Sequence, residues 1–337
     1  MIYNRKSAVS LKLRTKTKLD KLSRSELLTR LQIVRVIEPI TSAAYKKVEE
    51  EIWRDGSGNS PHGNPWHVSF HASQFPGDDP MACPRQAMYG MMDLPSAEPF
   101  NRRSRTVMAA GKSVEYELVS TFEKAGILIS ASPDAEVQTG FEYPSAWLTG
   151  SVDCVLLPDG YTAPLPIEIK SKYQSAIDEM KVGVRKPDQG HIFQTKVQLA
   201  LIRHEQENGG LWSDLDPVTH GFIYYLSRDR PSDTAEFRVD YDEKFFEMGI
   251  EQLKQWREMF INEELVSYNP SKKHPMGWRW SYQPCQWCNF KKTCKLDFEQ
   301  GVDKLEDSVG INRAKLVRED YDYTESRKRV LDRWKKG

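Results

Sequence analysis

Two carboxylates and a lysine stand out in two strand-like segments of the chain. Residues 146–157 and 165–172 are rich in apolar residues, and the second segment alternates with period two. Glu168 and Lys170 therefore share one face of their strand, and the isoleucines beside them face the opposite side. Asp153 lies in the preceding segment, and the short connection can bring it beside Glu168. The pattern predicts two carboxylates and one ammonium group that converge at strand ends.

This combination of groups suits one kind of chemistry in particular. Carboxylate oxygens bind hard divalent cations such as Mg²⁺ or Mn²⁺. A bound cation lowers the pKa of its water and neutralises charge on a scissile phosphate, and a nearby lysine such as Lys170 stabilises the charge of the transition state. An exposed edge strand with a Glu–Lys pair has the same spacing, so the surrounding residues must decide between the two interpretations.

Two predicted helices carry further polar residues that could join such a site. The helix at residues 106–125 has Glu115 at the border of its apolar stripe, either as a third metal ligand or as a flanking surface residue. The helix at residues 190–207 has Gln194 and Gln198 one turn apart, beside its apolar stripe. Two amides at this spacing can bind a phosphate backbone or a carboxylate, or they form a polar shoulder of the helix.

Four of the five cysteines have a spacing typical of metal or cluster binding. Cys285, Cys288 and Cys294 form a compact group, and Cys83 is the natural fourth ligand about two hundred residues earlier. We read no secretory signal at the N-terminus, so the thiols are expected to be reduced. Spacing alone does not separate zinc from an iron–sulfur cluster. Cys154 follows Asp153 and is predicted to be a buried core thiol.

The charge is balanced overall but unevenly distributed. The chain has 337 residues, with 48 Lys and Arg against 48 Asp and Glu. Its first 35 residues contain ten basic residues against two acidic ones. This segment is either a basic arm that contacts phosphates or a solvated leader. No apolar run approaches the length that a membrane span needs.

The chain is predicted to have three parts. Residues 1–65 are interpreted as a basic helical extension, which ends in a Gly-, Pro- and Asn-rich stretch. Residues 66–300 form the main domain, and residues 301–337 form a charged helical tail. Within the main domain, the order helix, strands, helix, strands, helix predicts an α/β fold with a mixed sheet.

Taken together, these motifs resemble the PD-(D/E)xK nucleases. They are similar in particular to the RecB-type exonucleases with an iron–sulfur staple, a group that includes the CRISPR adaptation nucleases and the AddB nuclease domain. The matching motifs occur in the family's order over about residues 68–295: Cys83-Pro84-Arg85, Gly111-x3-Glu115, Gly150-x2-Asp153, Glu168-Ile169-Lys170, Gln194-x3-Gln198 and Cys285-x2-Cys288-x5-Cys294.

The resemblance implies a fold and a set of roles. The fold would be restriction-endonuclease-like, with a mixed central sheet flanked by helices and a C-terminal segment stapled by iron and sulfur. Asp153 and Glu168 would hold Mg²⁺ or Mn²⁺ with the main-chain carbonyl of Ile169. Lys170 would be the catalytic lysine, and Gln194 would belong to the family's glutamine-containing helix beside the active site.

Two positions depart from the family pattern, and one set of residues completes it. Glu115 stands where many members have His, and it can still bind Mg²⁺. Gln198 replaces the usual Tyr, as in phage λ-type exonucleases. The resemblance implies that a [4Fe–4S] cluster, with zinc as the alternative, is held by Cys83, Cys285, Cys288 and Cys294.

The implied function is a metal-dependent DNA exonuclease that acts on single-stranded or end-exposed DNA in recombination, repair or phage DNA processing. A non-catalytic iron–sulfur DNA-binding module and an endonuclease of the same superfamily are the alternatives. We expect a cytoplasmic protein, in the host cytoplasm if it is phage-encoded, with a helicase, recombinase or single-strand-binding protein as partner. Candidate DNA contacts are Arg102, Arg103, Arg105, Gln198, Trp278, Arg279 and Trp280.

Overall fold

The computed structural model describes residues 69–76, 83–92, 94, 102–130, 139–265, 288, 290–317 and 321–335. The chain divides into two compact units, residues 1–52 and 53–337, and every described residue belongs to the second unit. The predictions made for residues 1–65 therefore lie outside the described residues.

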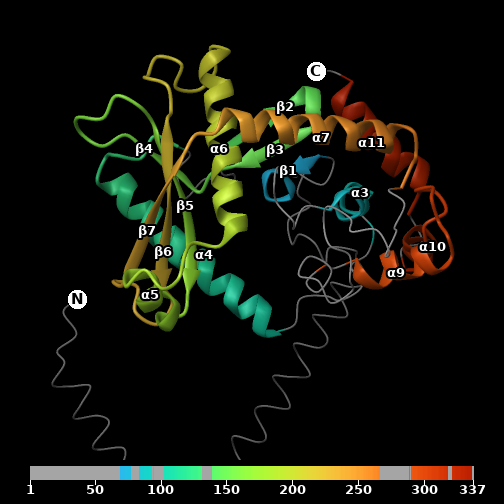
Figure 1. The fold of residues 1–337 in the computed structure, drawn as a ribbon, viewed down its shortest axis with the longest axis horizontal. Helices are drawn as coiled ribbons and strands as arrows, with labels where there is room; N and C mark the ends of the chain where they lie inside the picture. The colour runs from blue at the N-terminus through green and yellow to red at the C-terminus, as the bar shows by residue number, and fades with distance from the viewer. Residues whose placement is uncertain are drawn as a thin grey trace, which may run out of the picture. The chain divides into compact units, whose positions relative to one another are not determined.

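The larger sheet has four strands in the order β4-β5-β6-β7 (Figure 1). These are Cys154–Leu156, Leu165–Lys172, His220–Ser227 and Thr234–Asp240. β5 and β6 are parallel, whereas β4–β5 and β6–β7 are antiparallel. The prediction of an α/β fold with a mixed sheet is confirmed, and β5 begins and ends at the predicted residues.

A smaller sheet of three strands lies beside it, in the order β1-β3-β2. Its strands are Phe70–His71, Leu148–Ser151 and Gly140–Tyr143, with short 3₁₀ helices at Ala72–Gln74 (η3) and Pro144–Ala146 (η4). β1 pairs with β3 in parallel and β2 pairs with β3 antiparallel. The sequence analysis did not predict this second sheet.

The prediction of one continuous strand over residues 146–157 is wrong. The chain leaves the smaller sheet after Ser151 and enters the larger one at Cys154, so Asp153 lies at a corner between the two. Asp153 Oδ2 accepts a hydrogen bond from the backbone N–H of Ile169 at 2.7 Å. Most of both halves is buried, and the sequence does not show which strand each half pairs with, so the pattern gave no sign of the break.

Two long helices cover opposite faces of the larger sheet. α4 (Arg102–Lys124) packs against the face that carries Ile167 and Ile169. α6 (Gln189–Glu207) covers the face that carries Ile223 and Tyr225, and Figure 1 shows the two helices on either side of the strands. Both helices were predicted from their apolar spacing, and both predictions are confirmed.

The other helices complete the core. α7 (Glu243–Ile261) is the last helix in the predicted order of elements, and α5 (Gln174–Lys181) follows β5. Four further helices are α3 (Pro84–Met91), α9 (Lys291–Glu299), α10 (Val309–Val317) and α11 (Tyr323–Trp334). The C-terminal helices pack into the core, because Trp334 is buried and its ring stacks on Trp147 with centroids 6.3 Å apart.

A buried polar network joins α3 to α9 and α10. Asp297 is fully buried and accepts hydrogen bonds from Tyr89 Oη at 2.6 Å, Ser308 Oγ at 2.7 Å and Val309 N at 2.7 Å. Arg85 of α3 donates to Tyr89 Oη at 3.3 Å. Since a buried carboxylate is tolerated only when it is hydrogen-bonded, this network fixes α3 against the C-terminal helices.

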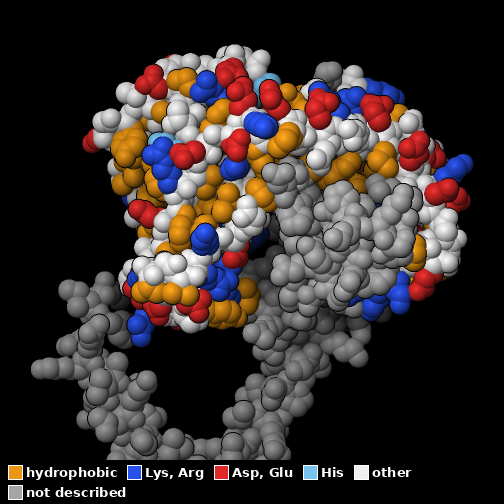
Figure 2. Space-filling view, in the orientation of Figure 1, with side chains coloured by type: hydrophobic (Ala, Val, Ile, Leu, Met, Phe, Trp, Pro, Cys, Tyr) orange, Lys and Arg blue, Asp and Glu red, His pale blue; other side chains and the backbone are white. Residues whose placement is uncertain are grey.

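The described face that is visible in Figure 2 is mixed in charge. Figure 2 shows Lys and Arg side chains interspersed with Asp and Glu over the visible described face. None of the helices in the described ranges is long and apolar enough to cross a membrane.

Gly249 of α7 makes a sharp test of this packing. A Cβ at this position would lie 2.0 Å from Phe75 Cε1, and Phe75 is already stacked on Phe246 with ring centroids 5.6 Å apart. We expect Gly249→Ala to lower the free energy of unfolding by about 1–3 kcal/mol through overpacking, measured by urea denaturation.

Gly90→Ala in α3 is the matched control, because a Cβ there meets nothing within 4 Å. It should leave stability unchanged or raise it by up to about 1 kcal/mol. Equal urea midpoints for Gly249→Ala and the wild type would contradict the packing described here.

Candidate functional site

The residues predicted to do chemistry come together at the corner between the two sheets. We call Glu115, Asp153, Glu168 and Lys170 the acidic cluster. Asp153 comes from the corner itself, Glu168 and Lys170 from β5, and Glu115 from α4. Each of the three carboxylates contributes to the electrostatic environment of Lys170. The convergence predicted from the sequence is therefore present.

Glu168 is the most enclosed member of the acidic cluster. Its side chain is fully buried, and its Oε1 forms an ion pair with Lys170. Its Oε2 accepts a hydrogen bond from Gln198 Nε2 at 2.5 Å. The same amide nitrogen donates to the Ser151 carbonyl at 2.8 Å. The amide orientation is fixed by these contacts, because the opposite orientation would bring Oε1 against the Glu168 carboxylate.

The carboxylates near Asp153 affect its pKa. Burial raises this pKa well above its usual range, and the neighbouring Glu168 carboxylate raises it further. Burial alone would lower the pKa of Lys170, but the carboxylates of Glu168 and Asp153 outweigh burial and raise it. Lys170 thus stays charged, and its single positive charge faces more than one carboxylate.

Close packing between α4 and β5 brings Glu115 to the acidic cluster. A Cβ on Gly111 would lie 3.4 Å from Ser171 Oγ, so the helix crosses the end of β5 at short range. Glu115 lies one turn further along α4 and adds to the rise in the pKa of Asp153. The sequence analysis placed Glu115 at the border of the apolar stripe, and this position explains how it reaches the site.

The chemistry of this donor set fits a hard divalent cation. The side chains of Asp153, Glu168 and Glu115 are oxygen donors, and these three carboxyl groups outnumber the single ammonium group of Lys170. Among the described residues, however, no three His, Cys, Asp or Glu side chains are arranged as a set of metal ligands. The carboxylates interact electrostatically here without forming a coordination sphere.

The two glutamines of α6 have different positions. Gln198, predicted as a DNA contact, is buried against Glu168. Gln194, predicted to belong to the catalytic helix face, is half-buried and makes no side-chain hydrogen bond within the described part of the chain. The structure thus brings Gln198, and not Gln194, into direct contact with the acidic cluster.

Two histidines that the sequence analysis did not single out lie within the electrostatic reach of Lys170. Burial and Lys170 lower the pKa of His71 in β1, and burial with Lys170 and Lys172 lowers that of His191 in α6 to about 4. The spacing in α6 was the available signal, because His191 precedes Gln194 by three residues and Gln198 by seven. Both imidazoles are therefore neutral at physiological pH.

Three of the four predicted cluster-binding cysteines can be placed. Cys83 precedes α3, Cys294 lies in α9, and Cys288 lies one turn before α9. The ring of Tyr89 in α3 contacts Phe290 at 5.5 Å between centroids, and Cys294 contributes to raising the pKa of Tyr89. Cys285 lies outside the described residues. Cys154 is fully buried in the core beside α4, and this confirms its predicted role.

Several predicted DNA contacts lie outside the part of the chain whose side chains the structure describes. Trp278, Arg279 and Trp280 lie outside the described residues. The backbone at Arg102, Arg103 and Arg105 belongs to the first turns of α4, but their side chains are not described.

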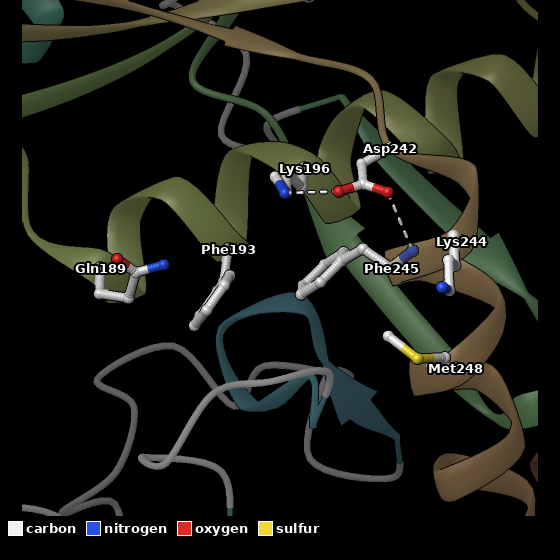
Figure 3. A pocket seen from close by; sticks show the side chains of 7 residues that line it. All are labelled: Gln189, Phe193, Lys196, Asp242, Lys244, Phe245 and Met248. Atoms are coloured by element: carbon white, nitrogen blue, oxygen red, sulfur yellow. Dashed lines mark hydrogen bonds and ion pairs between the residues drawn. The ribbon is translucent and has the colours of Figure 1, made fainter.

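A pocket of about 530 Å³ lies on a different flank of α6, toward α7 (Figure 3). Figure 3 shows the Asp242 carboxylate between the Lys196 ammonium group, at 2.7 Å, and the backbone N–H of Phe245, at 3.1 Å. The pocket contains no member of the acidic cluster. Its lining residues are Gln189, Phe193, Lys196, Asp242, Lys244, Phe245 and Met248.

Comparison with known proteins adds only distant likenesses. No family model matches the chain, and no curated protein matches it. Among solved structures, an alkaline exonuclease (LHK-Exo) from Laribacter hongkongensis has a TM-score of 0.39 and 17% identity, covering 58% of this chain and 91% of that chain. LHK-Exo in complex with dAMP has a TM-score of 0.39 and 16% identity, with coverages of 64% and 93%. SSO0001 has the same TM-score and 16% identity, with coverages of 76% and 96%.

The crowded charge of the acidic cluster makes a stability prediction. Asp153→Asn keeps an oxygen that can accept from Ile169 N but removes one buried negative charge. We expect this variant to be more stable than the wild type by about 1 kcal/mol in EDTA at neutral pH, measured by urea unfolding.

Asp159→Asn on the surface is the control and should leave the urea midpoint unchanged. A loss of stability in Asp153→Asn would mean that the Asp153 charge is already compensated in the folded protein.

Proposed function

We propose that this chain is a metal-dependent DNA nuclease of the PD-(D/E)xK type, and specifically an exonuclease that acts on single-stranded or end-exposed DNA. The observation that carries the proposal is the acidic cluster. Three carboxylates surround one lysine at a sheet corner, and burial together with Glu168 raises the pKa of Asp153. Such an excess of carboxyl groups over cationic side chains suits a site that takes up a cation.

The cation in this proposal is Mg²⁺ or Mn²⁺. The carboxylates of Asp153, Glu168 and Glu115 would hold it, with the main-chain carbonyl of Ile169. When bound, the cation supplies a water of lowered pKa and neutralises charge on the scissile phosphate. Two donors prepare the site in advance: the Ile169 N–H holds Asp153, and the Gln198 amide holds Glu168.

The proposed reaction is hydrolysis of a phosphodiester bond. The water gives up one proton to solvent as its oxygen bonds to phosphorus, the bond to O3′ breaks, and O3′ takes up a proton from solvent. The products are a 5′-phosphate and a 3′-hydroxyl. Lys170 carries the only positive charge of the acidic cluster, and its ammonium group stabilises the negative charge that develops on the phosphate oxygens.

Residues outside the acidic cluster would bind the DNA substrate. Basic side chains at Arg102, Arg103 and Arg105 are assigned to phosphates, and the segment 278–280 is assigned to base stacking. A helicase, a recombinase or a single-strand-binding protein is the proposed partner in recombination, repair or phage DNA processing.

Cleavage of linear and covalently circular single-stranded DNA tests the proposal. With Mg²⁺ or Mn²⁺, the wild type should degrade the linear substrate only, and Asp153→Ala, Glu168→Ala and Lys170→Ala should lose activity by at least about a hundredfold. Asp159→Ala is the surface control and should cut normally. End-labelled product analysis on gels checks each variant.

Each other outcome has a definite meaning. Cutting of circles assigns an endonuclease of the same chemistry. Wild-type rates in Lys170→Ala remove the lysine from the mechanism. Tight DNA binding without any cutting favours the non-catalytic binding module.

We further propose that Cys83, Cys285, Cys288 and Cys294 hold a [4Fe–4S] cluster that ties the front of the domain to its back, with zinc as the alternative. The support is the proximity of α3 and α9. Tyr89 contacts both Phe290 and Asp297, and Cys294 acts electrostatically on Tyr89 and Arg85. Cys83 and Cys288 also pack against the same core as Cys294. A cluster bound here would close a loop of about two hundred residues.

The cluster predicts a colour and a stability effect. Protein purified without oxygen should be brown and absorb at about 400 nm, and Cys83→Ser should lose iron and destabilise the domain. Cys154→Ser is the matched control, because Cys154 lies in the core beside α4, and it should keep its iron content. A colourless protein that contains zinc would replace the cluster assignment, and unchanged metal content in Cys83→Ser would remove Cys83 from the site.

A further inference from the structure

α6 and β5 pack against each other and are joined by two polar contacts. Glu168 of β5 contacts Gln198 of α6, and Lys172 forms an ion pair with Asp188, which directly precedes α6. Four residues of strand span about 13 Å, and ten residues of helix span about 15 Å, so the two elements run side by side in opposite directions. His191 lies between these two contacts on α6, as Lys170 lies between them on β5.

Tyr225 places His191 at the level of Lys170. In the parallel pairing of β5 with β6, Tyr225 is the register partner of Lys170, so both side chains face α6. Tyr225 Oη lies 2.8 Å from His191 Nδ1, and the two rings are 5.7 Å apart between centroids. The imidazole of His191 is thus hydrogen-bonded to β6, at the residue that pairs with Lys170 of β5.

The same hydroxyl is the group that faces Nδ1 of His191. Tyr225 Oη accepts a hydrogen bond from the backbone N–H of Asp188 at 3.1 Å. The tautomer that suits this arrangement has the tyrosine proton directed at His191 Nδ1, which accepts it. In this tautomer the single proton of the neutral imidazole sits on Nε2.

Both partners keep these protonation states at physiological pH. Burial, Lys170 and Lys172 lower the pKa of His191 to about 4, and only the Asp188 carboxylate opposes them. Burial raises the pKa of Tyr225 to about 12. His191 is half-buried, and in the described part of the chain its Nε2–H donates to no acceptor. The result is an uncharged N–H donor held beside an ammonium group.

We propose that His191 binds a non-bridging phosphate oxygen of the DNA strand next to Lys170, through an Nε2–H group that Tyr225 holds in place. The inference rests on the proposed nuclease function and assigns a substrate-binding residue to that site. A phosphate needs hydrogen-bond donors as well as charge, and a fixed neutral donor loses little conformational freedom on binding. Tyr225 is then a positioning residue, because it acts on the DNA only through His191.

Three substitutions separate this role from a purely structural one. His191→Gln places an amide N–H near the position of Nε2, whereas His191→Asn places its amide near Nδ1. Tyr225→Phe removes the hydroxyl and keeps the ring. Tyr241→Phe is the matched control, because it removes a hydroxyl of a tyrosine outside the acidic cluster.

The first measurement is fluorescence anisotropy with a short labelled single strand in EDTA, where metal-dependent cutting is absent. His191→Asn should weaken binding about tenfold, the effect of losing one hydrogen bond to a charged group. His191→Gln should bind close to the wild type, and Tyr225→Phe should fall between them. With Mg²⁺, the same order should appear in KM, and kcat should change little.

The second measurement is the ¹⁵N–¹H spectrum of the histidine rings, with the His191 signal assigned from its loss in His191→Gln. The Nε2–H form is expected in the wild type, and Tyr225→Phe should show a mixture of forms. An Nδ1–H form in the wild type overturns the inference. So does a His191→Gln variant that binds as weakly as His191→Asn, since the donor at Nε2 would then not be the important group.

The failure of this inference differs from the failure of the proposed function. A wild type that cuts DNA, with His191 variants that bind and cut normally, removes only the His191 assignment. A wild type that neither binds nor cuts any DNA overturns the nuclease proposal and this inference with it.

Discussion

The burial of Glu168 beside Asp153 is the constraint on which the rest of the site depends. A buried carboxylate costs several kcal/mol unless charge or hydrogen bonds compensate it. Glu168 forms an ion pair with Lys170 and accepts a hydrogen bond from Gln198. Asp153 accepts a hydrogen bond from the Ile169 N–H and interacts electrostatically with the same lysine. The compensation is incomplete, since the pKa of Asp153 remains raised. The fold thus keeps a region of excess negative charge that structural stability alone would not select.

The change of sheet at Asp153 creates this region, and a close helix contact maintains it. Beside this corner, α6 approaches β3 closely enough for Gln198 to reach both Ser151 and Glu168. Gly150 makes the approach possible, because a Cβ there would lie 2.7 Å from Leu201 Cδ1. One glycine in the smaller sheet therefore determines the position of a helix that closes the site over the larger one.

Much of this arrangement could be predicted from local patterns. Period-two alternation gave β5 with its bounds, and helical spacing gave α4 and α6. The break within 146–157 could not be predicted, because the two halves differ in their pairing partners, which the sequence does not show. Helical spacing also placed Gln194 and Gln198 beside the apolar stripe without deciding which one faces Glu168. That choice depends on how α6 packs on the sheet, which is a tertiary property.

His191 shows why the remaining part of the site needed the structure. The helical spacing of His191 with Gln194 and Gln198 was the available signal, but it does not show what His191 contacts, because its partner Tyr225 lies 34 residues later in the chain. The two meet only because β6 pairs with β5 in parallel, which puts Tyr225 beside Lys170. Since Gln198, His191 and Asp188 all belong to or directly precede one rigid helix, their contacts with the strands are set together. A small shift of α6 along its axis would disturb both the burial of Glu168 and the orientation of His191. The packing that encloses the Glu168 carboxylate therefore also positions Gln198 and His191 around it.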